Sequence, residues 1–219
     1  TRLGFKIKRA ENFPMIYYYP NLDSSLFNET LKLFQYKYSI NPREWNRNVF
    51  PFTKEQLEVT GTKLNIGCFH MYLRGWTNID IKDDIRIDKK MDLRKIKEHY
   101  LDNSVDIILI SHCLEHITFE EGKKVIKDIF KILKPNGHLV IEVPNCEGLD
   151  EKLGKNEISE STYFCYMYGT PNEFGQEHKS AYTEKILTDF LKEAGFKNIK
   201  RNYELTHNMN GLRFDCRKE

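Results

Sequence analysis

Four residues with acid–base and metal-binding chemistry stand out in the sequence. His112, Glu115 and His116 lie in "SHCLEH", spaced i, i+3, i+4, so a helical turn would place them on one face. His178 lies far along the chain, in "GQEHKSAY". Such a set could serve two purposes, which the residues alone leave open. One of the three histidines could act as a general base, or the set could hold a divalent metal ion.

The stretch "LNIGCFHMYLRGWTNID" has the outline of a nucleotide-type cofactor site. Gly67 ends an apolar run and permits close backbone approach, and Asp80 closes the next run with a carboxylate suited to ribose hydroxyls. The phosphate-binding fingerprint GxGxxG is absent, and the loop is too short for a full crossover helix. These features disfavour NAD and FAD and favour S-adenosylmethionine, whose adenosine carries no phosphate.

Short apolar strands alternate with helices around these motifs. Strands are predicted at residues 63–67, 76–81, 85–88, 104–111, 138–143, 196–205 and 211–218, and helices at 93–100, 118–134 and 183–195. Residues 144–181 are predicted to form a long irregular stretch. The alternation indicates an α/β fold with a doubly wound, Rossmann-like sheet that binds ligands beyond the carboxyl ends of its strands.

Together, these motifs resemble those of class I S-adenosylmethionine-dependent methyltransferases. The match is closest to members with "LNxGCG…GWxNxD", "SVDxxxxxxxLEH" and "LKPGGxLxIxVPN", and it covers about residues 63–200. The resemblance implies a seven-stranded sheet with its last strand antiparallel. It extends to sugar and glycan O-methyltransferases, which makes a sugar hydroxyl the leading acceptor.

The resemblance also implies which residues contact the cofactor. Gly67 and the Cys68–Phe69 backbone would form the methionine-side wall, and Phe69 replaces a family glycine. Its ring either turns away or packs on the cofactor. The full implied set is Gly67, Cys68, Phe69, Asp80 for the ribose, Ile81, Asp92 and Leu93 for the adenine, and Ser111 beside the methionine.

The histidine-rich set is similar to the E-x-x-E-H metal motif, with a later histidine, of ubiquinone-biosynthesis and small-RNA 2′-O-methyltransferases. It implies His112, Glu115, His116 and His178 as ligands of Mn²⁺ or Mg²⁺. Here His112 replaces the first glutamate, which favours Mn²⁺, Fe²⁺ or Zn²⁺ over Mg²⁺. In metal-free relatives, residues such as Glu115 and His116 mainly bind local backbone.

The composition narrows the classes of partner. Lys and Arg number 34 against 32 Asp and Glu, with no basic run, so a nucleic-acid partner is not expected. No apolar stretch approaches the roughly 20 residues that a membrane-spanning helix requires. Five scattered cysteines without a CxxC pair predict reduced thiols and a cytoplasmic location. The sequence leaves the oligomeric state open.

Two further predictions concern the acceptor. Residues 1–60 are expected to form a mostly helical appendage, a lid or a packing segment, before a methyltransferase domain at residues 61–219. The irregular stretch should cover the acceptor with Tyr163, Phe164, Tyr166, Tyr168 and Phe174. Alternatives are a small aromatic, quinone-like or amine acceptor, or a silent binding module whose cofactor pocket Phe69 blocks.

Overall fold

The computed structural model describes residues 7–10, 13–16, 52–69, 71–83, 87–170, 175–206 and 210–219. The chain divides into two compact units, Thr1–Pro42 and Arg43–Glu219. In the first unit, β1 (Ile7–Ala10) and β2 (Phe13–Ile16) pair as an antiparallel hairpin, which the sequence analysis did not predict. Most of residues 1–60, expected to form a mostly helical appendage, lies outside the described residues, so the role of this segment stays a prediction.

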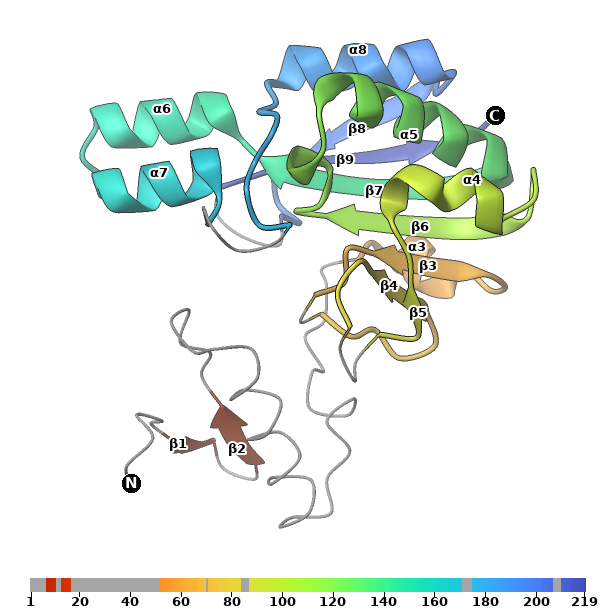
Figure 1. Cartoon of the computed structure of the whole chain (residues 1–219), viewed down its shortest axis with the longest axis horizontal. Helices are drawn as coiled ribbons and strands as arrows, with labels where there is room; N and C mark the ends of the chain where they lie inside the picture. Colours follow the sequence, from red (N-terminus) through yellow and green to blue (C-terminus); the bar gives the residue numbers. More distant parts are fainter. Residues whose placement is uncertain are drawn as a thin grey trace. The chain divides into compact units, whose positions relative to one another are not determined.

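The second unit is built on a seven-stranded sheet in the order β5-β4-β3-β6-β7-β9-β8 (Figure 1). Strand β9 is antiparallel to both of its neighbours, and the remaining pairs are parallel. This confirms the predicted Rossmann-like sheet with its last strand antiparallel. The strands are β3 (Lys63–Ile66), β4 (Thr77–Asp80), β5 (Lys89–Lys90), β6 (Val105–Ser111), β7 (Leu133–Pro144), β8 (Asn198–Asn202) and β9 (Gly211–Arg217).

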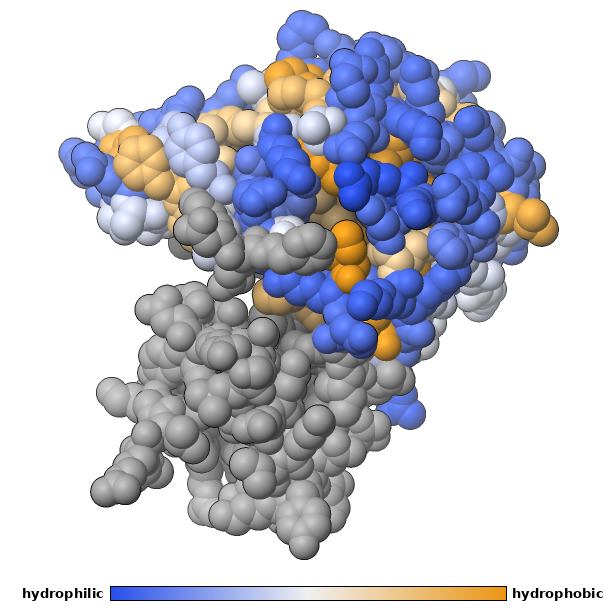
Figure 2. Space-filling view, viewed as in Figure 1, coloured by the Kyte–Doolittle hydropathy of each residue, from blue (hydrophilic) through white to orange (hydrophobic). Residues whose placement is uncertain are grey.

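Amphipathic helices cover one face of this sheet, where the main core lies. These helices are α4 (Ile96–His99), α5 (Phe119–Ile132) and α8 (Glu184–Ala194). Helix α5, predicted at residues 118–134, begins at a capping box formed by Thr118 and Glu121, and α8 is capped by Thr183 and by Gly195, which has a φ of +112°. Figure 2 shows mostly hydrophilic residues on the outward side of these helices, as expected when their apolar sides pack on the sheet.

The opposite face of the sheet carries a smaller apolar cluster. Ile107 and Leu109 of β6 belong to this cluster, while Ile108 and Ile110, which alternate with them along the strand, belong to the main core. Phe52 and Val59, on either side of α3 (Lys54–Glu58), pack against this smaller cluster. A strand buried on both faces reads as a continuous apolar run, which is why β6 gave the clearest strand signal in the sequence.

Two predictions of local structure were wrong. The stretch 144–181 contains two helices, α6 (Cys146–Gly154) and α7 (Glu160–Tyr168), capped by Asn145 and Ser159. Neither has a strong apolar stripe, because their hairpin extends beyond the sheet, at the left of Figure 1. Of the third strand predicted at residues 85–88, residues 85 and 86 lie outside the described residues, residues 87 and 88 are not in a strand, and β5 is Lys89–Lys90. The Asp88 carboxylate, just before β5, accepts hydrogen bonds from the backbone and side-chain N–H groups of Asn78 of β4 at 2.9 and 2.8 Å.

Within the described ranges, no helix is long and apolar enough to cross a membrane. All five cysteines are free, as their scattered positions predicted.

Candidate active site

The predicted site residues gather at the carboxyl ends of β3, β4 and β6. Two adjoining cavities open there, a smaller cavity of about 140 Å³ and a larger cavity of about 370 Å³. The residues that line both cavities are Gly67, Phe69, His112, His116 and Gln176. This is the edge at which parallel α/β sheets bind their ligands.

Gly67 is required at its position for two reasons. Its φ is +67°, and an added Cβ would lie 2.5 Å from the Sγ atom of Cys113. The N–H groups of Gly67 and Cys68 both donate to the carbonyl of Ile79, at 2.8 and 3.0 Å. The loop after β3 is therefore fixed to β4, with the buried Cys68 against the wall of the larger cavity.

Asp80 lies at the end of β4, 8% exposed, beside the smaller cavity. Its two carboxylate oxygens accept hydrogen bonds from the backbone N–H groups of Phe69 and Lys82, each at 2.9 Å. Because each carboxylate oxygen has a second lone pair, both can still accept a hydrogen bond from a ligand hydroxyl. Ile81 lines the same cavity.

Phe69 lines both cavities. The Nζ atom of Lys82 lies 4.8 Å from the ring centroid. The φ of Phe69 is +37°, a left-handed conformation that is costly for a large side chain. Phe69 therefore occupies a backbone position suited to glycine and borders both cavities.

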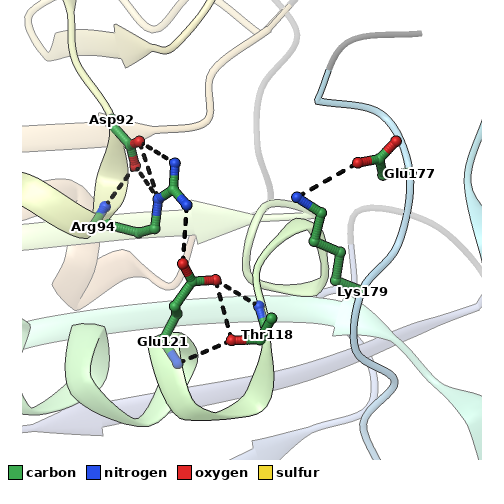
Figure 3. A network of polar contacts seen from close by, with 6 residues as sticks. All are labelled: Asp92, Arg94, Thr118, Glu121, Glu177 and Lys179. Atoms are coloured by element: carbon green, nitrogen blue, oxygen red, sulfur yellow. Dashed lines mark hydrogen bonds and ion pairs between the residues drawn. The ribbon is translucent and has the colours of Figure 1, made fainter. Parts of the chain in front are cut away.

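At the other end of the smaller cavity, Asp92 and Leu93 lie next to Arg94, which the sequence analysis missed. The Arg94 guanidinium contacts the Asp92 carboxylate and donates to Glu121 of α5 at 2.9 Å (Figure 3). Hydrogen bonds from Arg94 hold the pKa of Asp92 below its ordinary value, against the opposing effect of burial. The Arg94 guanidinium, held by the carboxylates of Asp92 and Glu121, thus forms part of the wall of the smaller cavity.

Ser111 ends β6 and faces the larger cavity. Its side chain is 5% exposed, and its Oγ atom has no hydrogen-bond partner in the described part of the chain. A buried hydroxyl that lacks a partner is unusual, and a bound ligand would supply one.

His112 is separated from the other predicted ligands. The turn after β6 is a single 3₁₀ turn, η2 (Leu114–His116), and His112 precedes it with a φ of +49°. Its Nδ1 and Nε2 atoms lie 3.4 and 3.6 Å from the carboxylates of Glu115 and Glu142. Burial alone would lower the pKa of His112, but the two carboxylates raise it to about 9. The described residues whose ligand atoms lie close enough together to share a metal ion are Glu115, His116 and His178, and His112 is not among them.

Glu115, His116 and His178 form a cluster that could hold a metal ion. One ligand atom from each residue lies within 4.8 Å of the others. Glu115 is 1% exposed, and neither of its carboxylate oxygens accepts a hydrogen bond in the regions described, although Oε1 lies 3.4 Å from the Nδ1 atom of His112. The Nδ1 atom of His116 lies 3.1 Å from the carbonyl of Glu177, so the tautomer that donates there leaves the lone pair on Nε2.

Backbone hydrogen bonds bring His178 to this cluster from far along the chain. The N–H groups of Lys179 and Ser180 donate to the carbonyl of Glu115 at 2.8 and 3.1 Å, and that of His178 donates to Tyr168 at 3.0 Å. Burial and the neighbouring His116 lower the pKa of His178, against the effect of Glu115. A neutral imidazole suits either a metal ligand or a base.

The aromatic residues predicted to cover the acceptor divide into two groups. Tyr166 of α7 lines the larger cavity. Phe164 and Tyr168 are exposed and stack on each other with ring centroids 6.0 Å apart, and Tyr163 donates to Asp150 at 2.7 Å. Phe174 lies outside the described residues.

The fold and site define a class I S-adenosylmethionine-dependent methyltransferase. A family model described as a methyltransferase domain matches residues 36–201, and the chain belongs to this family. No curated protein matches the sequence.

Solved structures share the fold. A methyltransferase from Archaeoglobus fulgidus has 18% identity and a TM-score of 0.53, covering 85% of this chain and 99% of its own. A protein from Thermotoga maritima, described as a possible histamine N-methyltransferase, has 13% identity and a TM-score of 0.53, covering 89% and 99%.

Gly169 tests how the His178 segment is held. Its φ is +70°, and an added Cβ would lie 2.0 Å from the carbonyl oxygen of Gln176. We expect Gly169→Ala to lower the free energy of unfolding by about 1–3 kcal/mol, measured by urea denaturation, and to weaken ligand binding at the cluster. Gly154→Ala is the matched control, because nothing lies within 4 Å of its added Cβ. Equal stability of the two variants would contradict this account.

The pH dependence of stability tests the charge of His112, which faces Glu115 on η2, Glu142 on β7 and, across the cluster, His178. Its pKa rises from 6.5 when unfolded to about 9 when folded. Its contribution to stability is therefore complete below pH 6.5 and is lost as the pH rises through about 9. In EDTA, the melting-temperature difference between the wild type and His112→Gln should shrink over this range. A constant difference would show that His112 is not held as a cation.

Proposed function

We propose that the protein transfers the methyl group of S-adenosylmethionine to a hydroxyl group of a sugar or glycan. The observation that carries the proposal is the junction of the two cavities. The smaller cavity has the Asp80 carboxylate, the larger cavity has Glu115, His116 and His178, and they meet at Phe69 and His116. Methyl transfer needs two ligands held end to end, and two joined cavities with these different linings suit that task.

The residues around the smaller cavity would bind and orient the cofactor. Asp80 would accept hydrogen bonds from the ribose hydroxyls, and Leu93 and Arg94 would flank the adenine. Ser111 would offer its unpaired hydroxyl to the methionine part. The methyl group would then point to the larger cavity, past Phe69. The bound cofactor supplies the methyl group, and the protein aligns the acceptor with it.

Glu115, His116 and His178 fit a divalent ion. Their ligand atoms are close together, the Glu115 oxygens lack hydrogen-bond partners in the described part of the chain, and His116 is oriented by Glu177. Two imidazoles and one carboxylate suit Mn²⁺, Fe²⁺ or Zn²⁺ better than Mg²⁺. When bound, such an ion lowers the pKa of an acceptor hydroxyl. In its absence, the neutral His178 would take the hydroxyl proton.

The lining of the larger cavity supports a sugar acceptor. Tyr166 gives the larger cavity an aromatic wall beside hydrogen-bonding side chains such as Ser111 and Gln176, which suits a hydroxylated ring. The motif resemblance points the same way. A screen of saccharides against phenols, quinols and amines for uptake of labelled methyl groups separates the acceptor classes, and methylation of phenols alone would reject the sugar.

The free thiols support a reducing compartment such as the cytoplasm.

Calorimetry with S-adenosylhomocysteine tests the cofactor site. We expect the wild type to bind, and Phe69→Gly to bind several-fold more tightly. The reason is that the smaller cavity, at about 140 Å³, falls below the roughly 300–1,000 Å³ of ordinary ligand pockets, and glycine adopts a positive φ without strain. Phe164→Ala, an exposed aromatic that does not line this cavity, is the control. No binding by either the wild type or Phe69→Gly would reject the proposed cofactor site.

Metal removal tests the cluster. We expect EDTA to abolish methyl transfer to the acceptor found in the screen, Mn²⁺ to restore it, and His178→Ala to lower kcat at least tenfold by removing one ligand. His99→Ala, at an exposed position on α4, should leave activity unchanged. Full activity in EDTA would eliminate the metal and leave His178 as the base.

A further inference from the structure

Glu142 carries a buried carboxylate that the proposed function does not use. It lies on β7, in register with Ser111 of β6, and its side chain is 0% exposed. An ionised carboxylate in such a place is strongly disfavoured unless a partner compensates its charge. Its presence therefore calls for a specific interaction nearby.

The neighbouring strand leaves room for this carboxylate. Gly211 of β9 has no side chain, and an added Cβ would lie 2.1 Å from the Oε1 atom of Glu142. The space that a side chain of β9 would occupy is thus taken by the Glu142 carboxylate. Any larger residue at 211 would displace it.

Glu142 contacts His112 in two ways. Its backbone carbonyl accepts the His112 N–H at 2.8 Å, and its Oε1 atom lies 3.6 Å from the His112 Nε2 atom. The φ of His112 is +49°, a conformation that a non-glycine residue keeps only when its surroundings hold it. Residue 142 therefore fixes both the backbone and the ring of His112.

The other side of the same ring faces the metal-binding cluster. The Nδ1 atom of His112 lies 3.4 Å from Oε1 of Glu115. Glu142, His112 and Glu115 thus form a row of side chains in contact, carboxylate, imidazole and carboxylate, that ends at the cluster. Groups that orient a metal ligand from behind commonly change metal affinity by about 10- to 100-fold when they are removed.

We propose that Glu142 is a positioning residue, which acts through His112 to hold the Glu115 carboxylate in place for a divalent cation. The inference rests on the metal site of the proposed function. It assigns His112 to the support of a ligand, not to the ligand set itself. The divalent cation itself would be bound by Glu115, His116 and His178.

The test measures Mn²⁺ binding to the cofactor-free protein by electron paramagnetic resonance. We expect Glu142→Gln, which keeps the shape and removes the charge, to weaken Mn²⁺ binding about tenfold or more. In a His112→Gln background the same change should have almost no further effect, because the connection to Glu115 is already broken. Asp128→Asn is the control: it also removes a buried carboxylate, 5% exposed, but one paired with Lys124 and Lys131 on α5.

Three outcomes would overturn the inference: no Mn²⁺ binding to the wild type, wild-type affinity in Glu142→Gln, or equal losses in the two backgrounds. If Glu142→Gln does not fold, Glu142→Asp replaces it. This variant keeps the charge on a shorter side chain, so we expect weaker Mn²⁺ binding at a similar melting temperature, and wild-type affinity would reject the role. S-adenosylhomocysteine binding, measured separately by calorimetry, shows whether the methyltransferase site itself is sound.

Discussion

The site depends on two backbone hydrogen bonds to one atom, the carbonyl oxygen of Glu115. The donors are Lys179 and Ser180, and they join the turn after β6 to a segment more than sixty residues further along. His178 directly precedes these donors, so its side chain reaches the cluster only because this segment is fixed. Gly169 allows the close approach of the same segment to the end of α7. Three chain regions thus converge on one edge of the sheet.

Charge balance is the second constraint on this edge. Glu115 and Glu142 are both buried carboxylates, and His112 lies between them, its pKa raised to about 9 by the two carboxylates against the effect of burial. Two buried anions close together would destabilise the fold unless a positive group separated them. His112 meets that need at the cost of a strained backbone. This arrangement explains how a histidine can occupy position 112 without joining the ligand set, whereas burial is the main reason that the pKa of His178 is lowered.

Much of the fold could be predicted from the sequence. The apolar run of β6, the capping box at Thr118 and the Gly195 stop of α8 are local signals, and each is confirmed. Helices α6 and α7 escaped because they bury little, so no apolar stripe marks them. Strand β5 begins at Lys89, after Asp88, whose carboxylate accepts hydrogen bonds from Asn78. This contact is with a residue of another strand, so no local signal in the sequence shows it.

The position of the candidate site could be predicted in part, for a similar reason. Gly67, Asp80 and Ser111 lie near one another at one edge, as expected, because the strand ends of a parallel sheet converge there, which a sequence pattern can show. Arg94 and Glu142 were missed because their importance depends on contacts with residues distant in the sequence. The helical spacing of His112, Glu115 and His116 was misleading, since a left-handed residue precedes a 3₁₀ turn there.

The most direct test of the whole account is a crystal structure with S-adenosylhomocysteine and Mn²⁺ supplied. We predict the ribose hydroxyls on Asp80, and an anomalous peak bound by Glu115, His116 and His178, with His112 behind Glu115 and in contact with Glu142. A cofactor bound away from Asp80, or a metal bound by His112 in place of His178, would contradict it.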